Sequence, residues 1–130
     1  MQHPAFVRKT YAETLDLLVE ARNYLGLAGP SVGRSPIESV VGLRHSCEAL
    51  RVTARLTSVM AWLMMQRAIQ RGEVAEEQAL AGAAWLDGDP VCLTEADEPL
   101  LPQGLQSLLR RSLLLYVRVS RIEERLRQVA

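Results

Sequence analysis

The residues of this sequence that most resemble a reactive pair are His45 and Cys47, which lie two positions apart. A histidine that takes the proton of a cysteine thiol creates a nucleophilic thiolate. Both residues, however, belong to a stretch with helical periodicity, and residues two apart on a helix do not face each other. We therefore expect no catalytic cysteine–histidine pair at this place.

Other chemical motifs are also missing from the sequence. Asp87 and Asp89 suggest a calcium loop, but the full spacing of such a loop and its bidentate glutamate are absent. Cys47 and Cys92 are too far apart for a zinc motif, and there is no glycine-rich phosphate loop or nucleophile elbow. The sequence indicates no catalytic, cofactor-binding or metal-binding residue, so we expect a protein that is not an enzyme and needs no cofactor.

The element that organises the chain is a predicted helix over residues 37–71, which contains no proline and only one glycine, Gly42. At helical rise it is about 50 Å long. Apolar and small residues recur along it at steps of three and four, which is helical spacing. A first stripe consists of Leu43, Cys47, Leu50, Ala54, Thr57, Ala61, Met64 and Ala68, and a second stripe, about 180° away, consists of Val52, Leu56, Val59 and Leu63.

A small bundle needs one apolar face per helix, whereas this helix has two. We interpret the first stripe as the core stripe, on which Cys47 is a small buried residue. The surplus apolar residues are then Leu56, Val59, Trp62 and Leu63, which we predict to form a symmetric homodimer contact. The alternative is that a short helix of the same chain, at residues 73–85, covers them.

The rest of the sequence predicts a helical bundle. Helical spacing predicts further helices over about residues 5–27 and 101–129, and a short helix over residues 73–85. Residues 86–102 are predicted to be an acidic loop, because Asp87-Gly88 and Asp89-Pro90 are turn signals. We expect one domain, residues 1–130, with an all-α fold: an antiparallel three-helix bundle with a long central helix and a short additional helix, which dimerises.

The composition is that of a soluble globular protein, with 48% hydrophobic and 23% charged residues. The uncharged stretch at the centre of the long helix, residues 56–65, is too short to span a bilayer, so we expect no membrane contact. No export signal precedes the first helix, which predicts a cytoplasmic protein.

Charge is unevenly distributed, although the formal net charge is zero. Residues 72–109 contain eight acids and no Lys or Arg, so the remainder carries all 15 basic residues. Such asymmetry is typical of a contact surface for a charged partner, or of an acidic segment that folds over basic helices of its own bundle. The partner-binding candidates are Asp97 and Glu98 in the acidic loop and Arg118, Arg121 and Arg125 on the last helix.

Three segments carry a resemblance to a known family. They are Ala21-Arg22-Asn23-Tyr24 at the end of the first helix; Leu43-Arg44, Cys47-Glu48, Val52-Thr53-Ala54-Arg55-Leu56-Thr57 and Met60-Ala61-Trp62-Leu63-Met64 in the long helix; and Val91-Cys92-Leu93, Leu101-Pro102 and Arg111-Ser112 to Val119 near the end. With these segments the chain resembles the alphaproteobacterial RcdA family, the regulators of CtrA degradation. The resemblance covers about residues 11–126.

The resemblance implies a dimeric three-helix bundle that works without catalysis. It implies an adaptor for the ClpXP protease that acts with a response-regulator partner, helps to deliver protein cargo in cell-cycle regulated proteolysis, and gathers at the cell pole. No family motif defines catalytic residues, so none is assigned here.

Two other functions compete with this one. A helical regulator that binds nucleic acid through the arginine face would show steeply salt-dependent affinity, but the zero net charge and the lack of a DNA-binding motif make nucleic acid an unlikely partner. A helical enzyme would need titratable groups that converge in a pocket of the bundle.

Overall fold

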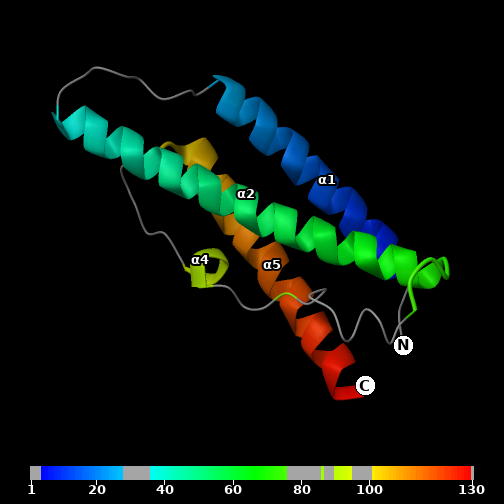
Figure 1. The fold of residues 1–130 in the computed structure, drawn as a ribbon. Coiled ribbons are helices and arrows are strands. Elements are labelled where there is room, and N and C mark those ends of the chain that lie inside the picture. Colours follow the sequence, from blue (N-terminus) through cyan, green and yellow to red (C-terminus); the bar gives the residue numbers. More distant parts are fainter. Residues whose placement is uncertain (1–3, 28–35, 76–85, 87–89, 95–100, 130) are drawn as a thin grey trace.

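The computed structural model is helical throughout its regular elements and describes residues 4–27, 36–75, 86, 90–94 and 101–129. Its helices are α1 (Pro4–Leu27), α2 (Pro36–Gln70), α4 (Pro90–Leu93) and α5 (Gln103–Val129) (Figure 1). The prediction of an all-α fold built on three long helices is confirmed, and the three lie within two residues of the expected bounds.

Side-chain contacts fix the directions of the three long helices. Arg67 of α2 lies over the ring of Tyr11 of α1, whereas His45, near the start of α2, stacks on Tyr24, near the end of α1. These two contacts make α1 and α2 antiparallel, as expected for helices joined by a short connection.

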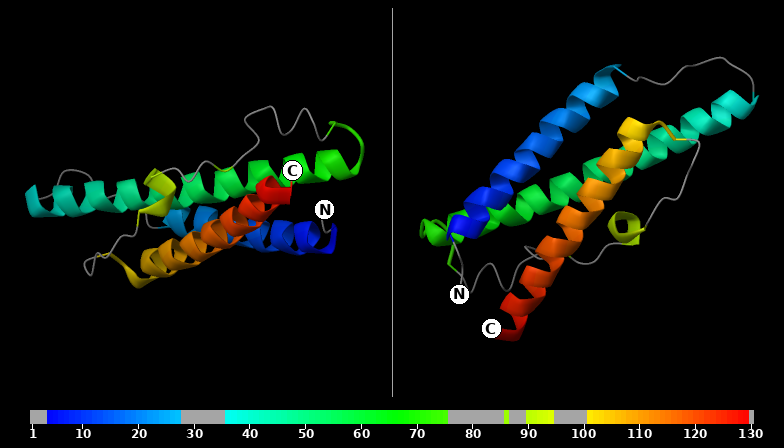
Figure 2. Two further views of the ribbon diagram at one scale, coloured as in Figure 1. Left: turned by 90° about the horizontal axis from the view of Figure 1, so that it is seen from below. Right: turned by 180° about the vertical axis from the view of Figure 1, so that it is seen from behind.

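The last helix runs opposite to α1 and in the same general direction as α2. Arg118 of α5 pairs with Glu13, and Gly104, at the beginning of α5, packs against the ring of Tyr24. In the left view of Figure 2, α1 and α5 lie on the same side of α2. One long side of α2 therefore faces both neighbours, and the opposite side faces neither.

The long helix ends at Gly72, as the sequence predicts. Gly72 has a φ of 75°, a backbone conformation that glycine adopts without the steric cost of a Cβ. Its N–H donates to the carbonyl of Ile69, and the N–H of Glu73 donates to the carbonyl of Ala68. This pair of bonds is a Schellman motif, which satisfies the last carbonyls of the helix.

The interpretation of the two stripes on α2 is wrong, because the second stripe forms the core. Leu56, Val59 and Leu63 are 0% exposed and Trp62 is 3% exposed, all enclosed by their own chain. These four side chains therefore offer no contact to a second copy, which corrects the predicted dimer interface. The physical reason is that α1 and α5 cover this side of α2 with long side chains of their own. They contribute Val7, Leu17, Leu105, Leu108, Leu115 and Val119.

The first stripe of α2 is the exposed one. Leu43 and Leu50 are 65% and 68% exposed, and Met64 is also exposed. Cys47 is exposed as well, so the expectation that it is a buried core residue is wrong.

The core face of α1 contains two threonines. Thr10 and Thr14 are buried between Val7 and Leu17, and the Thr14 hydroxyl donates to the Thr10 carbonyl at 2.7 Å. That bond satisfies the buried hydroxyl within the helix. Leu15, next to Thr14 in the sequence, is 44% exposed.

Several predictions fall on the connection between α2 and α5. Residues 73–75 are not helical, and the rest of the predicted short helix, residues 76–85, lies outside the described residues. The predicted loop 86–102 contains a helical turn, α4, which corrects that prediction. Asp97 and Glu98 also lie outside the described residues. Among the helices that the structure describes, none has the length and hydrophobicity needed to cross a membrane.

Candidate partner-binding surfaces

Arg55 of α2 is a buried side chain with four hydrogen bonds to other described residues. It is 1% exposed, and its guanidinium donates to the carbonyls of Cys92, Leu109 and Thr94, each at 2.7 Å. A fourth bond, at 3.1 Å, goes to the hydroxyl of Ser112. Because Cys92 and Thr94 belong to the α4 segment and Leu109 and Ser112 to α5, one side chain joins three elements.

Arg51, one turn before Arg55, holds the same segment from its outer side. It donates to the Val91 carbonyl at 2.6 Å and pairs with Glu48 at 2.8 Å. Its hydrogen bond to the Glu48 carboxylate raises the pKa of Arg51 above its ordinary value. Carbonyls at the end of a helix attract cations, so the two arginines fix the short helix α4 on the surface of α2.

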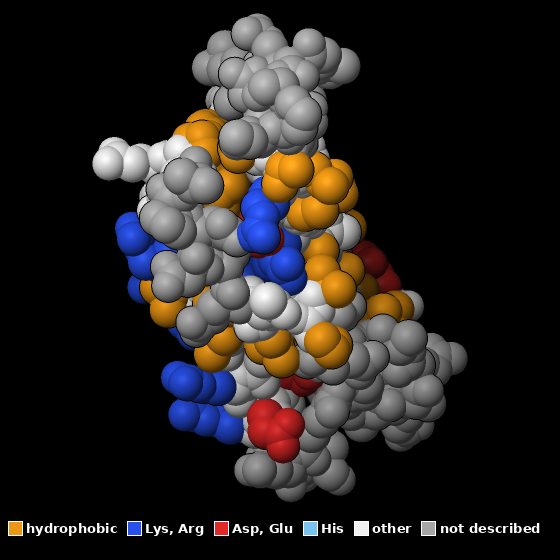
Figure 3. All heavy atoms as spheres, turned by 90° about the vertical axis from the view of Figure 1, so that its left-hand side faces the viewer, with side chains coloured by type: hydrophobic (Ala, Val, Ile, Leu, Met, Phe, Trp, Pro, Cys, Tyr) orange, Lys and Arg blue, Asp and Glu red, His pale blue; other side chains and the backbone are white. Residues whose placement is uncertain are grey.

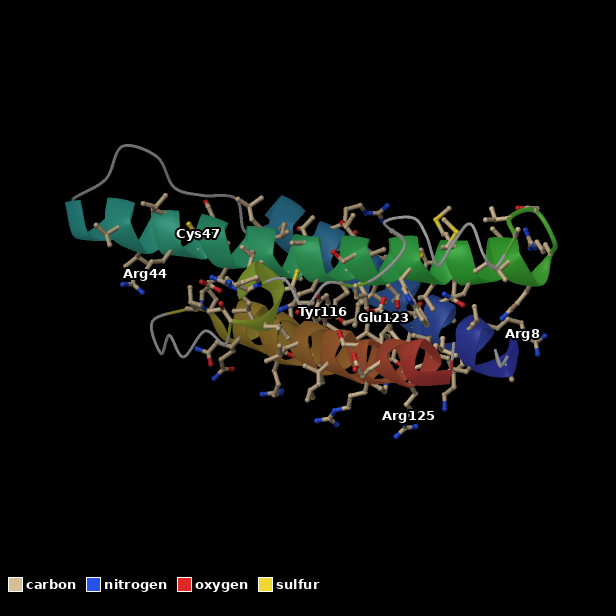
Figure 4. The ribbon with its side chains drawn as sticks, turned by 60° about the horizontal axis from the view of Figure 1, so that its bottom comes forward. Arg8, Arg44, Cys47, Tyr116, Glu123 and Arg125 are labelled. Carbon is tan, nitrogen blue, oxygen red and sulfur yellow. The ribbon has the colours of Figure 1, made fainter. Side chains whose placement is uncertain are left out.

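A second buried polar contact lies near the other end of α5. Glu123, labelled in Figure 4, is 3% exposed. It accepts a hydrogen bond from the backbone N–H of Leu86. It thereby fixes a residue of the α2–α5 connection against the bundle. Sequence reasoning missed both Arg55 and Glu123. The signal was their register: Arg55 lies one turn from Val52 and Val59, and Glu123 lies one turn after Val119.

The exposed side of α2 presents a long uncharged stripe, which we call the outer stripe: Leu43, Cys47, Leu50, Thr57, Ala61 and Met64. The short helix α4, which is bound by Arg51 and Arg55 in the first half of α2, also exposes Val91 and Leu93. Figure 3 views the molecule from the end at which α2 begins, and hydrophobic side chains surround a small basic group there. Exposed apolar patches can mark sites of protein interaction, so the outer stripe is a candidate binding surface.

The arginines of α5 differ in their partners. Arg118 donates to Glu13 of α1 at 2.7 Å, and Arg111 binds both carboxylate oxygens of Glu20. Arg121 and Arg125 are exposed and make no ion pair with any residue that the structure describes. Figure 4 shows Arg125 pointing away from the bundle. Of the three predicted partner-binding arginines, two are thus available and one is engaged within the chain.

The Glu20–Arg111 pair gives a testable pH dependence. The hydrogen bond from Arg111 lowers the pKa of Glu20 below its ordinary value of 4.5. A lowered folded-state pKa means that the stabilisation is present above pH 4.5 and is lost as the pH falls through the folded-state value. Both side chains are more than a third exposed, so we expect less than about 1 kcal/mol. In urea unfolding at pH 7 and at pH 3, Glu20→Gln should lose less stability on acidification than the unmodified protein.

Asp16→Asn is the matched control, because Asp16 is an exposed acid on the same helix. It should leave the acid-induced loss unchanged. An equal effect of the two substitutions would contradict a specific role of the Glu20–Arg111 pair.

The residues considered for chemistry are not brought together. His45 stacks on Tyr24 with ring centroids 6.3 Å apart, whereas Cys47 is an exposed free cysteine and Cys92 is a buried one. Within the described ranges, no three His, Cys, Asp or Glu side chains are grouped as metal ligands would be. The described surface presents separate apolar and basic areas.

Comparison with known proteins gives two matches. The protein family described as "Protein of unknown function (DUF1465)" matches residues 1–130. The crystal structure of RcdA from Caulobacter crescentus CB15 is similar, with a TM-score of 0.69 and 36% sequence identity over 92% of this chain and 88% of that chain. No curated protein matches the sequence.

Proposed function

This chain belongs to the DUF1465 family and is similar to RcdA in sequence and fold, and on that premise we propose that it is a non-enzymatic adaptor. In this role it links protein substrates to the ClpXP protease during cell-cycle regulated proteolysis, together with a response-regulator partner. The observation that carries the proposal is the 36% identity to RcdA over 92% of the chain with the same helical fold. We further propose that it acts in the cytoplasm, at the cell pole.

The arrangement of surfaces supports this role. An adaptor must contact a protease component and cargo, and linked weak contacts act at high effective concentration. The outer stripe of α2 is apolar, whereas the exposed side of α5 is basic, and the two lie on different helices. Two surfaces of different chemistry can bind two different partners at once. The acidic residues Asp97 and Glu98 stay a proposed third contact.

The homodimer is proposed to form through the outer stripe of α2. In a twofold contact the same stripe of each copy meets its counterpart. Thr57 and Ala61 at the centre are small, which permits close approach of two helices, and Leu43, Leu50 and Met64 supply apolar area. This location replaces the buried residues that the sequence suggested.

Charge on this stripe should separate the two copies. Leu43→Glu combined with Leu50→Glu places like charges across the twofold axis, which costs several kcal/mol at an interface. Because both leucines are exposed, the helical content should persist. Light scattering after size-exclusion chromatography should report dimer for the unmodified protein and monomer for this variant. The matched control is Leu114→Glu on α5, which should remain dimeric, and a monomeric unmodified protein would refute the proposed contact.

The function is tested by reconstituted proteolysis. Purified ClpX, ClpP and the response-regulator partner are mixed with a candidate cell-cycle regulator, with and without this protein, and cargo is followed over time. Faster degradation that requires this protein is the expected result. Cargo loss at the same rate in its absence, combined with no co-purification with ClpX, would rule the adaptor role out.

A further inference from the structure

The exposed side of α5 carries one continuous row of side chains, which we call the arginine stripe: Arg110, Leu114, Arg118, Arg121 and Arg125. Successive members are separated by four, four, three and four residues, so they share one face of the helix. All five are exposed, and Leu114 is 62% exposed. Arginine is enriched among the residues that contribute most to protein–protein binding, and the exposed leucine adds apolar area that a partner can bury.

The members of the stripe are not equivalent. Arg118 already donates to Glu13 of α1, which fixes its position and neutralises part of its charge. Arg110, Arg121 and Arg125 make no ion pair with the described part of the chain. The stripe therefore offers three cations and one apolar side chain.

The spacing of these four groups defines what fits them. At helical rise, Arg121 and Arg125 are about 6 Å apart along the axis, Leu114 lies about 10 Å before Arg121, and Arg110 lies about 6 Å before Leu114. These are separations of four, seven and four residues. A second helix lying along α5 repeats the same distances when its own side chains have the same spacing.

We propose that the arginine stripe docks one amphipathic helix of a protein partner, whose contact face carries two acids one turn apart, an apolar residue two turns further on, and a third acid one turn beyond. The proposal rests on the adaptor function and names the chemistry of one of its partners. Charge complementarity directs the acids to Arg125, Arg121 and Arg110, and the apolar residue packs on Leu114. Arg118, held by Glu13, borders the contact.

The same observations disfavour nucleic acid on this surface. Proteins that bind a duplex neutralise closely spaced phosphates with many basic groups. The stripe holds three available arginines over about 22 Å, with a leucine between them and the exposed Glu124 beside them. A leucine gains nothing against a phosphate backbone but stabilises a protein contact by burial.

The test uses the full chain and a synthetic probe. The probe is an alanine- and glutamine-based helical peptide with three glutamates and one leucine, placed in order Glu, Glu, Leu, Glu at separations of four, seven and four residues. In two-dimensional amide NMR at low salt, millimolar peptide should shift resonances of α5 between Arg110 and Arg125. A control peptide of the same composition, with its leucine on the opposite face, should bind at least several-fold more weakly.

Substitutions identify the groups that make the contact. Arg121→Glu with Arg125→Glu replaces two attractive pairs by repulsive ones and should weaken binding about tenfold or more. Arg8→Glu with Lys9→Glu makes the same change of charge on α1 and should weaken binding by less than about twofold. Circular dichroism should be unchanged in both variants, because all four side chains are exposed.

Three results would overturn the proposal: equal binding of both peptides, equal weakening by both charge variants, or no shift of α5 resonances. Duplex DNA that shifts α5 while the peptide does not would also overturn it, in favour of nucleic acid. The test is independent of the protease. Peptide binding without accelerated cargo degradation contradicts the adaptor function alone, whereas accelerated degradation without peptide binding contradicts the arginine stripe alone.

Discussion

Replacing Arg55 by methionine is expected to lower the free energy of unfolding by about 3–5 kcal/mol, because three carbonyls in the interior lose their hydrogen-bond donor. Methionine fills much of the volume of the side chain but donates no hydrogen bond. The carbonyls of Cys92, Leu109 and Thr94 then lose a charged donor, and buried carbonyls without a partner are costly. The α4 segment loses its attachment to α2 at the same time.

Thermal unfolding followed by circular dichroism measures this effect. For a domain of this size the expected decrease in melting temperature is roughly 10–20 °C. Arg55→Lys should recover little, because an ammonium cannot reproduce the flat array of guanidinium donors that reaches α4 and α5 together. Arg8→Met on the surface of α1 is the control and should change stability by less than about 0.5 kcal/mol. If Arg55→Met were as stable as this control, the hydrogen bonds of Arg55 to α4 and α5 would not contribute to the stability of the fold.

The second large effect on stability is expected at Leu63, and Leu50, on the opposite side of α2, serves as its comparison. Leu63 is 0% exposed and Leu50 is 68% exposed. Leu63→Ala should cost about 2–5 kcal/mol, because it removes buried methyl groups and leaves a cavity beneath α1 and α5. Leu50→Ala should change the stability of a single chain by less than about 0.5 kcal/mol.

Comparing the stabilities of Leu63→Ala and Leu50→Ala shows which of the two apolar stripes of α2 is buried. Urea unfolding at a protein concentration that favours monomer isolates the packing within one chain from any contact between copies. Similar small losses for both variants would contradict the observed core. A larger loss for Leu50→Ala would mean that the first stripe, as the sequence suggested, is the buried one.

Much of the fold follows from local features that the sequence displays directly. The three long helices begin and end within two residues of the predicted bounds, because helical spacing, proline and glycine act locally. Gly72 is the clearest case, since its positive φ closes α2 where the periodic pattern stops. The sequence also indicated the resemblance to the RcdA family, which agrees with the structural match.

The sequence predicted some of the candidate surface residues but not the contacts that they make within the folded chain. Arg121 and Arg125 are available as the pattern of α5 indicates, but Arg118 is tied to Glu13, a residue 105 positions away. Arg55 was not singled out from the sequence, although its register, one turn from Val52 and Val59, places it at the edge of the buried side of α2. Its burial depends on carbonyls supplied by α4 and α5, which come together only in the folded chain.

By itself, the sequence determined that α2 has two apolar stripes on opposite sides, because the identity and spacing of side chains set the periodicity of a helix. Only the tertiary structure decided which stripe is inside, because that depends on where α1 and α5 lie. Both pack on the side of Val52, Leu56, Val59 and Leu63, where large branched side chains fill the space between three helices. The stripe of Leu43, Leu50 and Met64 is left on the surface, and the same choice moves the proposed self-contact from the buried side of α2 to its exposed side.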